Sequence, residues 1–187
     1  MTNAIELRLA ALEAQSRIVA DKLAISEVIY RYCRSLDRLD QGLCASVFHD
    51  DASVDYGAAI YQGPIADFLP FAMQFQGAMR EAQHCVTNTL IDVDGDRAFS
   101  EAYVYAYHIQ EREGKAFELI VGARYLDVFT RRQGEWRIAQ RTEVIDWGQE
   151  RVLTDEWLVR NPGLLRGAHN QRDPLYELRA RFAAGLA

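Results

Sequence analysis

The sequence predicts an α+β fold in which one curved sheet wraps around N-terminal helices. Two observations carry this prediction. Apolar residues recur at helical spacing through residues 5–40. The second half contains long segments rich in β-branched and aromatic residues, which are separated by short turn sequences. Helices followed by a run of hairpins are typical of the α+β class, and 187 residues suffice for one domain with a sizeable core.

The N-terminal part is expected to be helical but interrupted. Asp21 stands where an N-cap would restart the apolar pattern, so we expect two helices, or one bent helix, with the break near residues 18–22. The piece before the break has an apolar stripe with nothing nearby in the sequence to bury it. We therefore expect residues 1–17 to form a helical extension that packs on a neighbouring subunit.

The middle of the chain is expected to contain a short helix, a strand, a turn and a longer helix. These lie at residues 44–48, 52–56, 61–64 and 65–79. Four long strands follow, joined by turns at Asp94-Gly95-Asp96 and at residues 132–135. They are predicted at residues 83–93, 97–111, 116–131 and 136–147. Residues 149–187 are expected to form an irregular tail with a last helix from Leu175, also packing on a neighbouring subunit.

Composition and missing motifs exclude several functions. A formal net charge of −6 disfavours nucleic-acid binding, and no stretch reaches the roughly 20 apolar residues of a membrane span. Three cysteines without C-x-x-C spacing, and a start unlike a signal peptide, favour the cytoplasm. The chain lacks nucleotide-binding glycine motifs, metal-ligand spacing and the serine hydrolase elbow, so no metal and no cofactor are expected.

Two candidate acid–base residues have ordinary structural interpretations when taken singly. Asp37 ends an apolar helix, where a carboxylate usually faces water or pairs with Arg34 or Arg38. His84 opens a strand-like segment, where a lone histidine is usually a core or rim residue. Histidine is nevertheless the side chain best suited to move a proton near neutral pH.

Alternation along two later strands adds further candidates. In the first, bulky tyrosines occupy one face, and small residues with one histidine occupy the other, as expected for a strand that lines a pocket. The second face comprises Val104, Ala106 and His108. In the last long strand Arg141 shares a face with Glu143 and Ile145. If this face is concave, Arg141 could bind an anionic or oxyanion group.

The spacing of these residues resembles a known family. Asp37 lies in L-D-R-x-D-x-G, thirteen residues before Asp50-Asp51 of F-x-D-D-A, and His84 opens H-C-V-T-N. Over residues 18–148 this pattern resembles the SnoaL-like branch of the nuclear transport factor two-like superfamily. The resemblance implies a cone-shaped α+β barrel with an apolar pocket, and a catalytic dyad of Asp37 and His84.

Dehydratases and dehydrochlorinases of this branch imply further site residues. Tyr32 and Arg141 occupy the places of a tyrosine and an arginine that assist the dyad, and His108 matches a second histidine. A second aspartate of one such dehydratase has no clear counterpart here. Candidate substrate-binding residues are Phe48, Val104, His108, Glu143 and Ile145.

The resulting hypothesis is a cofactor-independent lyase that acts on an apolar aromatic or polycyclic small molecule. His84 would remove a proton from carbon, and the reaction would be dehydration, dehydrohalogenation or loss of formaldehyde. An isomerase or cyclase using the same dyad, and a binding module similar to an oxygenase β-subunit, remain open alternatives. Members of this family form dimers or trimers, so a homodimer or homotrimer is expected.

Overall fold

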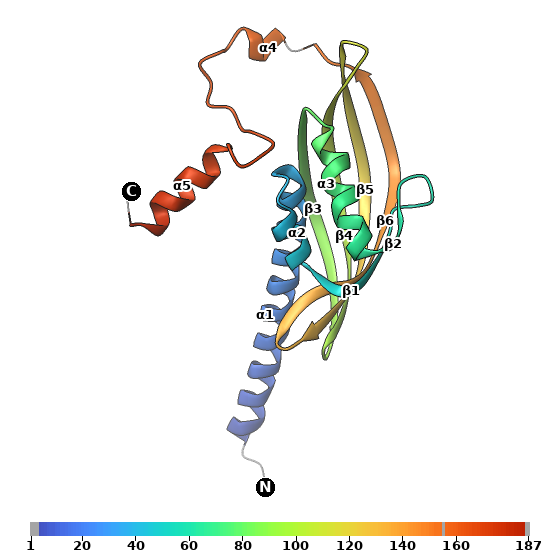
Figure 1. Ribbon diagram of the computed structural model, residues 1–187. Coiled ribbons are helices and arrows are strands. Elements are labelled where there is room, and N and C mark those ends of the chain that lie inside the picture. The colour runs from blue at the N-terminus through green and yellow to red at the C-terminus, as the bar shows by residue number, and fades with distance from the viewer. Residues whose placement is uncertain (1–3, 155, 186–187) are drawn as a thin grey trace.

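The computed structural model describes residues 4–154 and 156–185 and shows helices packed against one curved sheet (Figure 1). In the first part of the chain the elements are α1 (Ala4–Asp37), α2 (Gln41–Ser46), β1 (Phe48–Asp55), β2 (Gln62–Pro64) and α3 (Ile65–Gly77). The second part contains β3 (Glu81–Asp94), β4 (Arg97–Arg112), β5 (Lys115–Arg132), β6 (Glu135–Val152), α4 (Glu156–Val159) and α5 (Pro174–Ala183).

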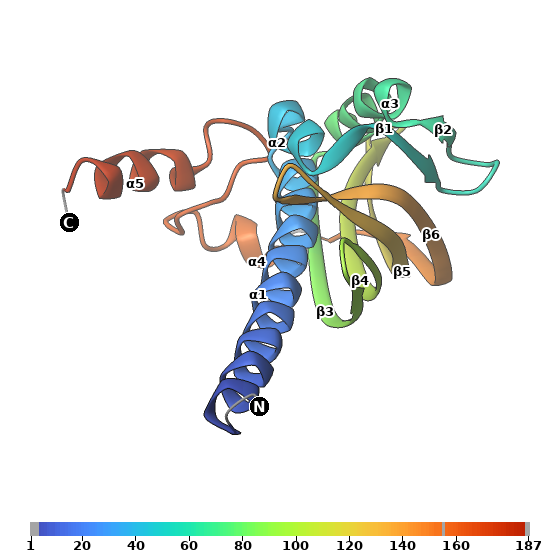
Figure 2. The ribbon, with the colours of Figure 1, turned by 90° about the horizontal axis from the view of Figure 1, so that it is seen from below.

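Within the described residues the sheet has six strands in the order β2-β1-β6-β5-β4-β3. Every pair is antiparallel except β1 with β6, which is parallel, so the sheet is mixed. The sheet curves around the C-terminal half of α1 and around α3 without closing (Figure 2). The predicted cone-shaped α+β architecture is confirmed, and its concave face supplies the walls of the pocket described below.

Helix α1 runs without the expected interruption. It is continuous through residues 18–22, so the prediction of a break was wrong. Asp21 is a tertiary contact instead of an N-cap: its Oδ1 accepts hydrogen bonds from Arg131 and from the indole of Trp136. Only the second half of the helix enters the core, through side chains at helical spacing that begin with Ile25. The first half projects from the body of the molecule (Figure 1).

The remaining elements follow the predicted order with five differences. α2 ends at Ser46 and β1 already begins at Phe48, so residues 48–51, which were expected to lie before the strand, belong to β1. β6 continues to Val152, beyond the predicted end of the last strand, because it pairs with β5 over its whole length. The short strand β2 takes up part of the predicted turn and pairs with the end of β1. α4 was not anticipated, and α5 begins one residue before Leu175, with Asp173 as its N-cap.

The tail folds back over its own domain before α5 projects away (Figure 1). Asp173 accepts hydrogen bonds from the backbone N–H groups of Ala168 and Leu175 and forms an ion pair with Arg38 at the end of α1. The His169 ring bonds to the backbone oxygen of Gln76 in α3. Among the described residues, no helix is both long enough and apolar enough to span a membrane.

Candidate active site

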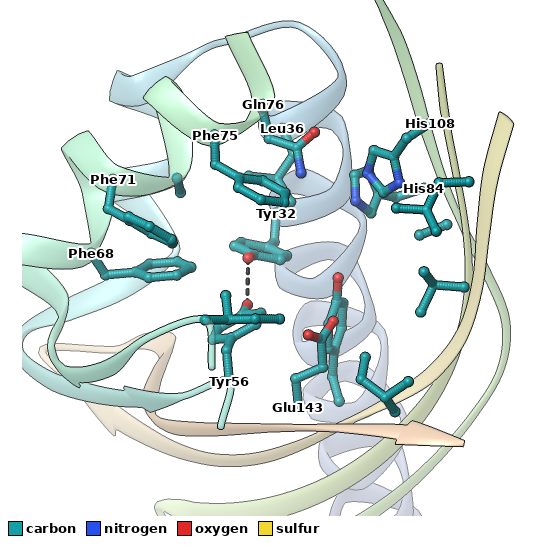
Figure 3. A pocket seen from close by; sticks show the side chains of 17 residues that line it. Tyr32, Leu36, Tyr56, Phe68, Phe71, Phe75, Gln76, His84, His108 and Glu143 are labelled. Carbon is teal, nitrogen blue, oxygen red and sulfur yellow. Dashed lines mark hydrogen bonds between the residues drawn. The ribbon is translucent and has the colours of Figure 1, made fainter. Parts of the chain in front are cut away.

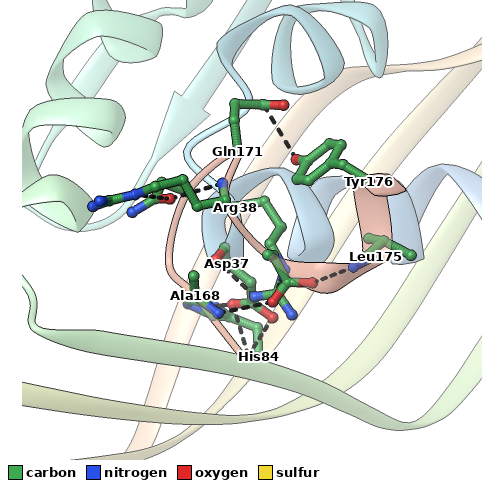
Figure 4. Close-up of polar contacts among 10 residues, drawn as sticks. Asp37, Arg38, His84, Ala168, Gln171, Leu175 and Tyr176 are labelled. Atoms are coloured by element: carbon green, nitrogen blue, oxygen red, sulfur yellow. Dashed lines mark hydrogen bonds and ion pairs between the residues drawn. The ribbon is translucent and has the colours of Figure 1, made fainter. Parts of the chain in front are cut away.

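Asp37 and His84 are in direct contact where α1 ends against β3 (Figure 4). The Asp37 Oδ1 atom lies 2.7 Å from His84 Nδ1, and the backbone N–H of His84 donates to both oxygens of the same carboxylate, at 3.0 and 3.2 Å. One aspartate therefore holds both the ring and the backbone of the histidine. The two side chains are 13% and 4% exposed, so solvent screens this contact little.

This geometry leaves one nitrogen of His84 for chemistry. A carboxylate at Nδ1 favours the tautomer in which Nδ1 carries the proton, so that Nε2 presents a lone pair. His84 lines the mostly apolar pocket that is described in the next paragraph, whereas Asp37 does not. Nε2 is therefore the ring nitrogen on the pocket side. Arg38 is not a partner of the Asp37 carboxylate, because its side chain is directed to Asp173 and to the Asp37 backbone oxygen.

The pocket lies between α1, α3 and the concave face of the sheet (Figure 3). Its empty space, including the part open to solvent, is about 730 Å³. Most lining side chains are aromatic or aliphatic, and a smaller set is polar. The polar and tyrosine residues are Tyr32, Tyr56, Gln76, His84, His108, Tyr125 and Glu143. Mostly apolar walls with a few convergent polar groups are typical of small-molecule sites.

Two tyrosine hydroxyls meet at one end of this pocket. The Tyr32 and Tyr56 hydroxyl oxygens are 2.5 Å apart, and the two side chains come from α1 and from the loop after β1. Burial raises the pKa of both phenols. Both therefore stay protonated at neutral pH. One hydroxyl donates to the other, and the remaining O–H of the pair can donate a hydrogen bond to a ligand. Tyr32 was a predicted site residue, whereas nothing in the sequence pattern indicated Tyr56.

Arg141 does not line the pocket, contrary to the expectation that it would bind an oxyanion directly. Its guanidinium is buried and donates two hydrogen bonds to Asp127, at 2.7 and 2.6 Å. The guanidinium carbon lies 4.0 Å from the ring centroid of Tyr32 and 4.1 Å from that of Tyr125. Arg141 therefore packs against the rings of Tyr32 and Tyr125 outside the pocket. Its charge lowers the pKa of Tyr32, Tyr56 and Tyr125 and so opposes the effect of burial.

The other predicted substrate-binding residues divide into two groups. His108, Glu143 and Ile145 line the pocket as expected. Phe48 and Val104 do not: both are buried in the hydrophobic core, and Phe48 packs edge-to-face against Tyr32 from outside the pocket. Alternation correctly placed Val104 on the inner face, but the helices cover that part of the sheet.

Two ionisable groups in the pocket have strongly shifted pKa values. Burial raises the pKa of Glu143 to about 7, although Arg141 and His84 act in the opposite direction. Burial, together with the proximity of His84 and His169, lowers the pKa of His108 to about 3. At neutral pH His108 is therefore uncharged, while Glu143 is close to half protonated. Such shifts, in groups that line one cavity, are typical of functional sites.

One more polar residue of the pocket was missed by the sequence analysis. Gln76 lines the pocket from α3 and carries no sequence signal beyond its helical position. The aromatic row Phe68, Phe71 and Phe75 has the spacing of one helix face, which could equally indicate core. In the part of the chain that the structure describes, no three His, Cys, Asp or Glu side chains are grouped as a metal site would require.

A family comparison agrees with this geometry. The model of the SnoaL-like domain matches residues 17–142. The chain belongs to the SnoaL-like family. The matched segment contains the dyad, the tyrosine pair and Arg141, but not Glu143, Ile145 or the tail that carries His169. No curated protein sequence matches this SnoaL-like chain significantly.

Solved structures share the fold of this SnoaL-like protein at low sequence identity. A candidate scytalone dehydratase from Novosphingobium aromaticivorans is 19% identical, with a TM-score of 0.65 over 75% of this chain and 93% of that one. Hexachlorocyclohexane dehydrochlorinase LinA-type3 from Novosphingobium barchaimii is 20% identical, with a TM-score of 0.60 over 73% and 92%. An NTF2-like protein with a cystatin-like fold, from Novosphingobium aromaticivorans, is 19% identical, with a TM-score of 0.59 over 78% and 92%.

Proposed function

We propose that this protein is a cofactor-independent lyase that eliminates a small leaving group from an apolar aromatic or polycyclic molecule. One observation carries the proposal: His84 is held by Asp37 through Nδ1, and its other edge is on the side of a mostly apolar pocket. A neutral imidazole in this position can accept a proton, and the adjacent carboxylate stabilises the imidazolium that forms.

The reaction starts with proton transfer from carbon to His84 Nε2. The electron pair of the broken C–H bond forms a double bond to the neighbouring carbon, and the leaving group departs from that carbon with its own electron pair. A halide leaves as the anion, whereas a hydroxyl group leaves as water after it receives a proton. In the variant that releases formaldehyde, His84 removes the proton from the hydroxymethyl oxygen, and the freed electron pair forms the C=O bond of formaldehyde. The electron pair of the broken C–C bond stays on the remaining carbon, which takes the proton back from His84.

The pocket holds candidate donors for the leaving group. The hydroxyls of Tyr32 and Tyr56 are close together and protonated, and Glu143 retains its proton up to a pH of about 7. His108 is less suited to be the acid, because its depressed pKa leaves it uncharged at neutral pH. We therefore assign His108 to ligand binding. Protonation of the leaving group is assigned to the tyrosine pair or to Glu143.

Two proteins of the same fold are named for eliminations. The structures that resemble this chain include a dehydrochlorinase and a candidate scytalone dehydratase. Both names describe removal of a small group from a small molecule. Because the identities are near 20%, the similarity shows a shared fold; it is compatible with elimination and leaves the substrate open.

Substitution of the dyad tests the proposal. We expect His84→Ala and Asp37→Asn each to lower turnover by about 10²–10⁴-fold while the protein stays folded. The assay incubates the enzyme with aromatic compounds that carry a hydroxyl, halide or hydroxymethyl group next to an acidic C–H, and measures product mass. His49→Gln is the matched control, because His49 bonds to the Thr130 backbone oxygen and does not line the pocket.

The mass of the product separates the alternatives. Loss of water, hydrogen halide or formaldehyde identifies a lyase, whereas an unchanged mass identifies an isomerase or cyclase that uses the same dyad. Full activity in His84→Ala would contradict the acid–base role. Absence of turnover together with capture of a large oxygenase subunit would instead indicate a binding module.

A further inference from the structure

Gln76 and His108 both line the end of the pocket that is near His84 (Figure 3). Gln76 comes from α3 and His108 from β4, and each residue is only 6% exposed. Within the described part of the chain, the Gln76 Oε1 atom and both ring nitrogens of His108 have no hydrogen-bond partner. Buried polar groups in folded proteins are nearly always bonded, because an unpaired one costs about 1–3 kcal/mol. These atoms are therefore suited to bind a ligand.

The available atoms define the group that fits them. A neutral imidazole offers one donor and one acceptor, and the Gln76 oxygen adds a second acceptor. His108 is neutral at the pH of the cell, because burial and its histidine neighbours lower its pKa. A group that both donates and accepts hydrogen bonds matches this set, and a hydroxyl is the simplest such group.

The charges around the pocket disfavour an anion. No lysine or arginine is among the residues that line it, and Arg141 is already paired with Asp127. Glu143 is the lining carboxyl group, and it gains negative charge as the pH rises. The nearest basic group to a carboxylate placed beside Gln76 and His108 would be His84, which is already paired with Asp37. Burial of the carboxylate there is therefore unfavourable.

An aromatic wall leads to this polar end. Phe68, Phe71 and Phe75 follow one another along α3, with ring centroids 6.2 and 6.1 Å apart, and Gln76 follows directly. Flat ligand rings can pack against this row, which would place a ring substituent beside Gln76 and His108. The wall and the polar end together suit a hydroxylated aromatic ring.

We propose that the Gln76–His108 end of the pocket binds an uncharged hydroxyl group on an aromatic ligand and discriminates against a carboxylate at the same place. Gln76 and His108 are thus specificity-determining residues. The inference rests on the pocket of the proposed lyase but not on its reaction. It names the substrate class as neutral hydroxylated aromatics.

The test compares three probes that share one ring system: naphthalene, 2-naphthol and 2-naphthoate. None carries a leaving group, so binding is measured by equilibrium dialysis without turnover. We expect the wild-type protein to bind 2-naphthol roughly five- to tenfold more tightly than naphthalene, as one net set of hydrogen bonds predicts. We expect 2-naphthoate to bind no more tightly than naphthalene.

Two variants connect this preference to the residues. In Gln76→Leu and in His108→Phe, 2-naphthol and naphthalene should bind about equally, with the affinity for naphthalene retained. Gln74→Leu is the control on the same helix, because Gln74 is exposed and does not line the pocket; it should keep the wild-type preference. Gln76→Met and His108→Leu replace either variant that does not fold, as judged by circular dichroism.

Three results would overturn the inference. These are equal binding of 2-naphthol and naphthalene by the wild-type protein, survival of the preference in both variants, and tightest binding of 2-naphthoate. Each is distinct from failure of the proposed reaction. The dialysis experiment uses unreactive probes, so its result is independent of whether the protein catalyses an elimination.

Discussion

Asp37 illustrates how a tertiary contact reverses a local electrostatic preference. The last turn of a helix carries partial negative charge, which disfavours a carboxylate at that place. Asp37 is nevertheless the final residue of α1, and its two oxygens accept hydrogen bonds from the His84 backbone and face the His84 ring. These bonds compensate for the unfavourable position. They also fix which edge of the imidazole is on the pocket side.

Glu143 provides a prediction at the same scale. Its pKa is raised to about 7 by burial, against the opposing effects of Arg141 and His84, with Tyr56 and Tyr125 nearby. The folded protein binds the Glu143 proton more tightly than the unfolded chain does. Below the unfolded pKa both states carry the proton, and the folded state has its full stability. As the pH rises towards the folded pKa, the unfolded chain releases the proton first, so the free energy of unfolding falls. Relative to Glu143→Gln, the wild-type protein should therefore lose up to about 3 kcal/mol of unfolding free energy between pH 4.5 and 7.

The measurement is urea unfolding of both proteins across this pH range. His108 acts in the opposite direction, because a histidine with a lowered pKa contributes stability that is lost as the pH falls. Both proteins contain His108, so its effect cancels in the difference between their free energies of unfolding. Glu113→Gln, at an exposed turn, is the control and should show a flat difference. A flat difference for Glu143→Gln as well would show that Glu143 is ionised normally.

At the scale of elements, Asp21 attaches α1 to two hairpin turns of the sheet. Its Oδ1 accepts from Arg131 at 2.7 Å and from the Trp136 indole at 2.9 Å, and Arg131 also donates to Asp96. Arg131 in turn stacks over the Trp136 ring, 4.9 Å from its centroid. The long helix and the ends of four strands are thereby tied together in one polar cluster.

Loss of this contact should be measurable as stability. We expect Asp21→Ala to lower the free energy of unfolding by about 1–2 kcal/mol, because the partly buried Trp136 N–H loses its acceptor. Glu27→Ala is the matched control on the same helix; it removes an exposed pair with Arg31 and should cost less than about 0.5 kcal/mol. Chemical denaturation compares the two, and equal losses would show that the cluster does not stabilise the fold.

At the scale of the whole molecule, two helical segments project from the body with exposed apolar side chains (Figures 1 and 2). The part of α1 before Ile25 carries Leu7, Leu9, Leu12, Val19 and Leu23, each more than half exposed. α5 has no buried residue among those described, and its Leu178 and Phe182 are also exposed. Exposed apolar surface of this extent is typical of an interface.

We propose that a second copy of this chain covers these helices, in a homodimer or homotrimer. Multi-angle light scattering should give an oligomeric mass for the wild-type protein, and Leu9→Glu combined with Leu12→Glu should lower it. Leu165→Glu is the control, because Leu165 is exposed in the loop between α4 and α5. A monomeric wild-type protein would contradict the proposal.

The sequence by itself determined the fold class and the order of most elements. Both follow from local properties: the period of apolar residues distinguishes helix from strand, and turn residues mark the hairpins. Sequence spacing also pointed to the pairing of Asp37 with His84, although only through resemblance to a family, since residues 47 positions apart reveal no contact by periodicity.

Only the tertiary structure decided which side chains meet in the pocket. Arg141 and Glu143 share one face of β6, yet Arg141 is buried with Asp127 whereas Glu143 reaches the pocket. Tyr56 and Gln76 join the pocket without any sequence signal. The physical reason is that alternation specifies a face of the sheet, while the curvature of the sheet and the packing of α1 and α3 determine which parts of that face remain open.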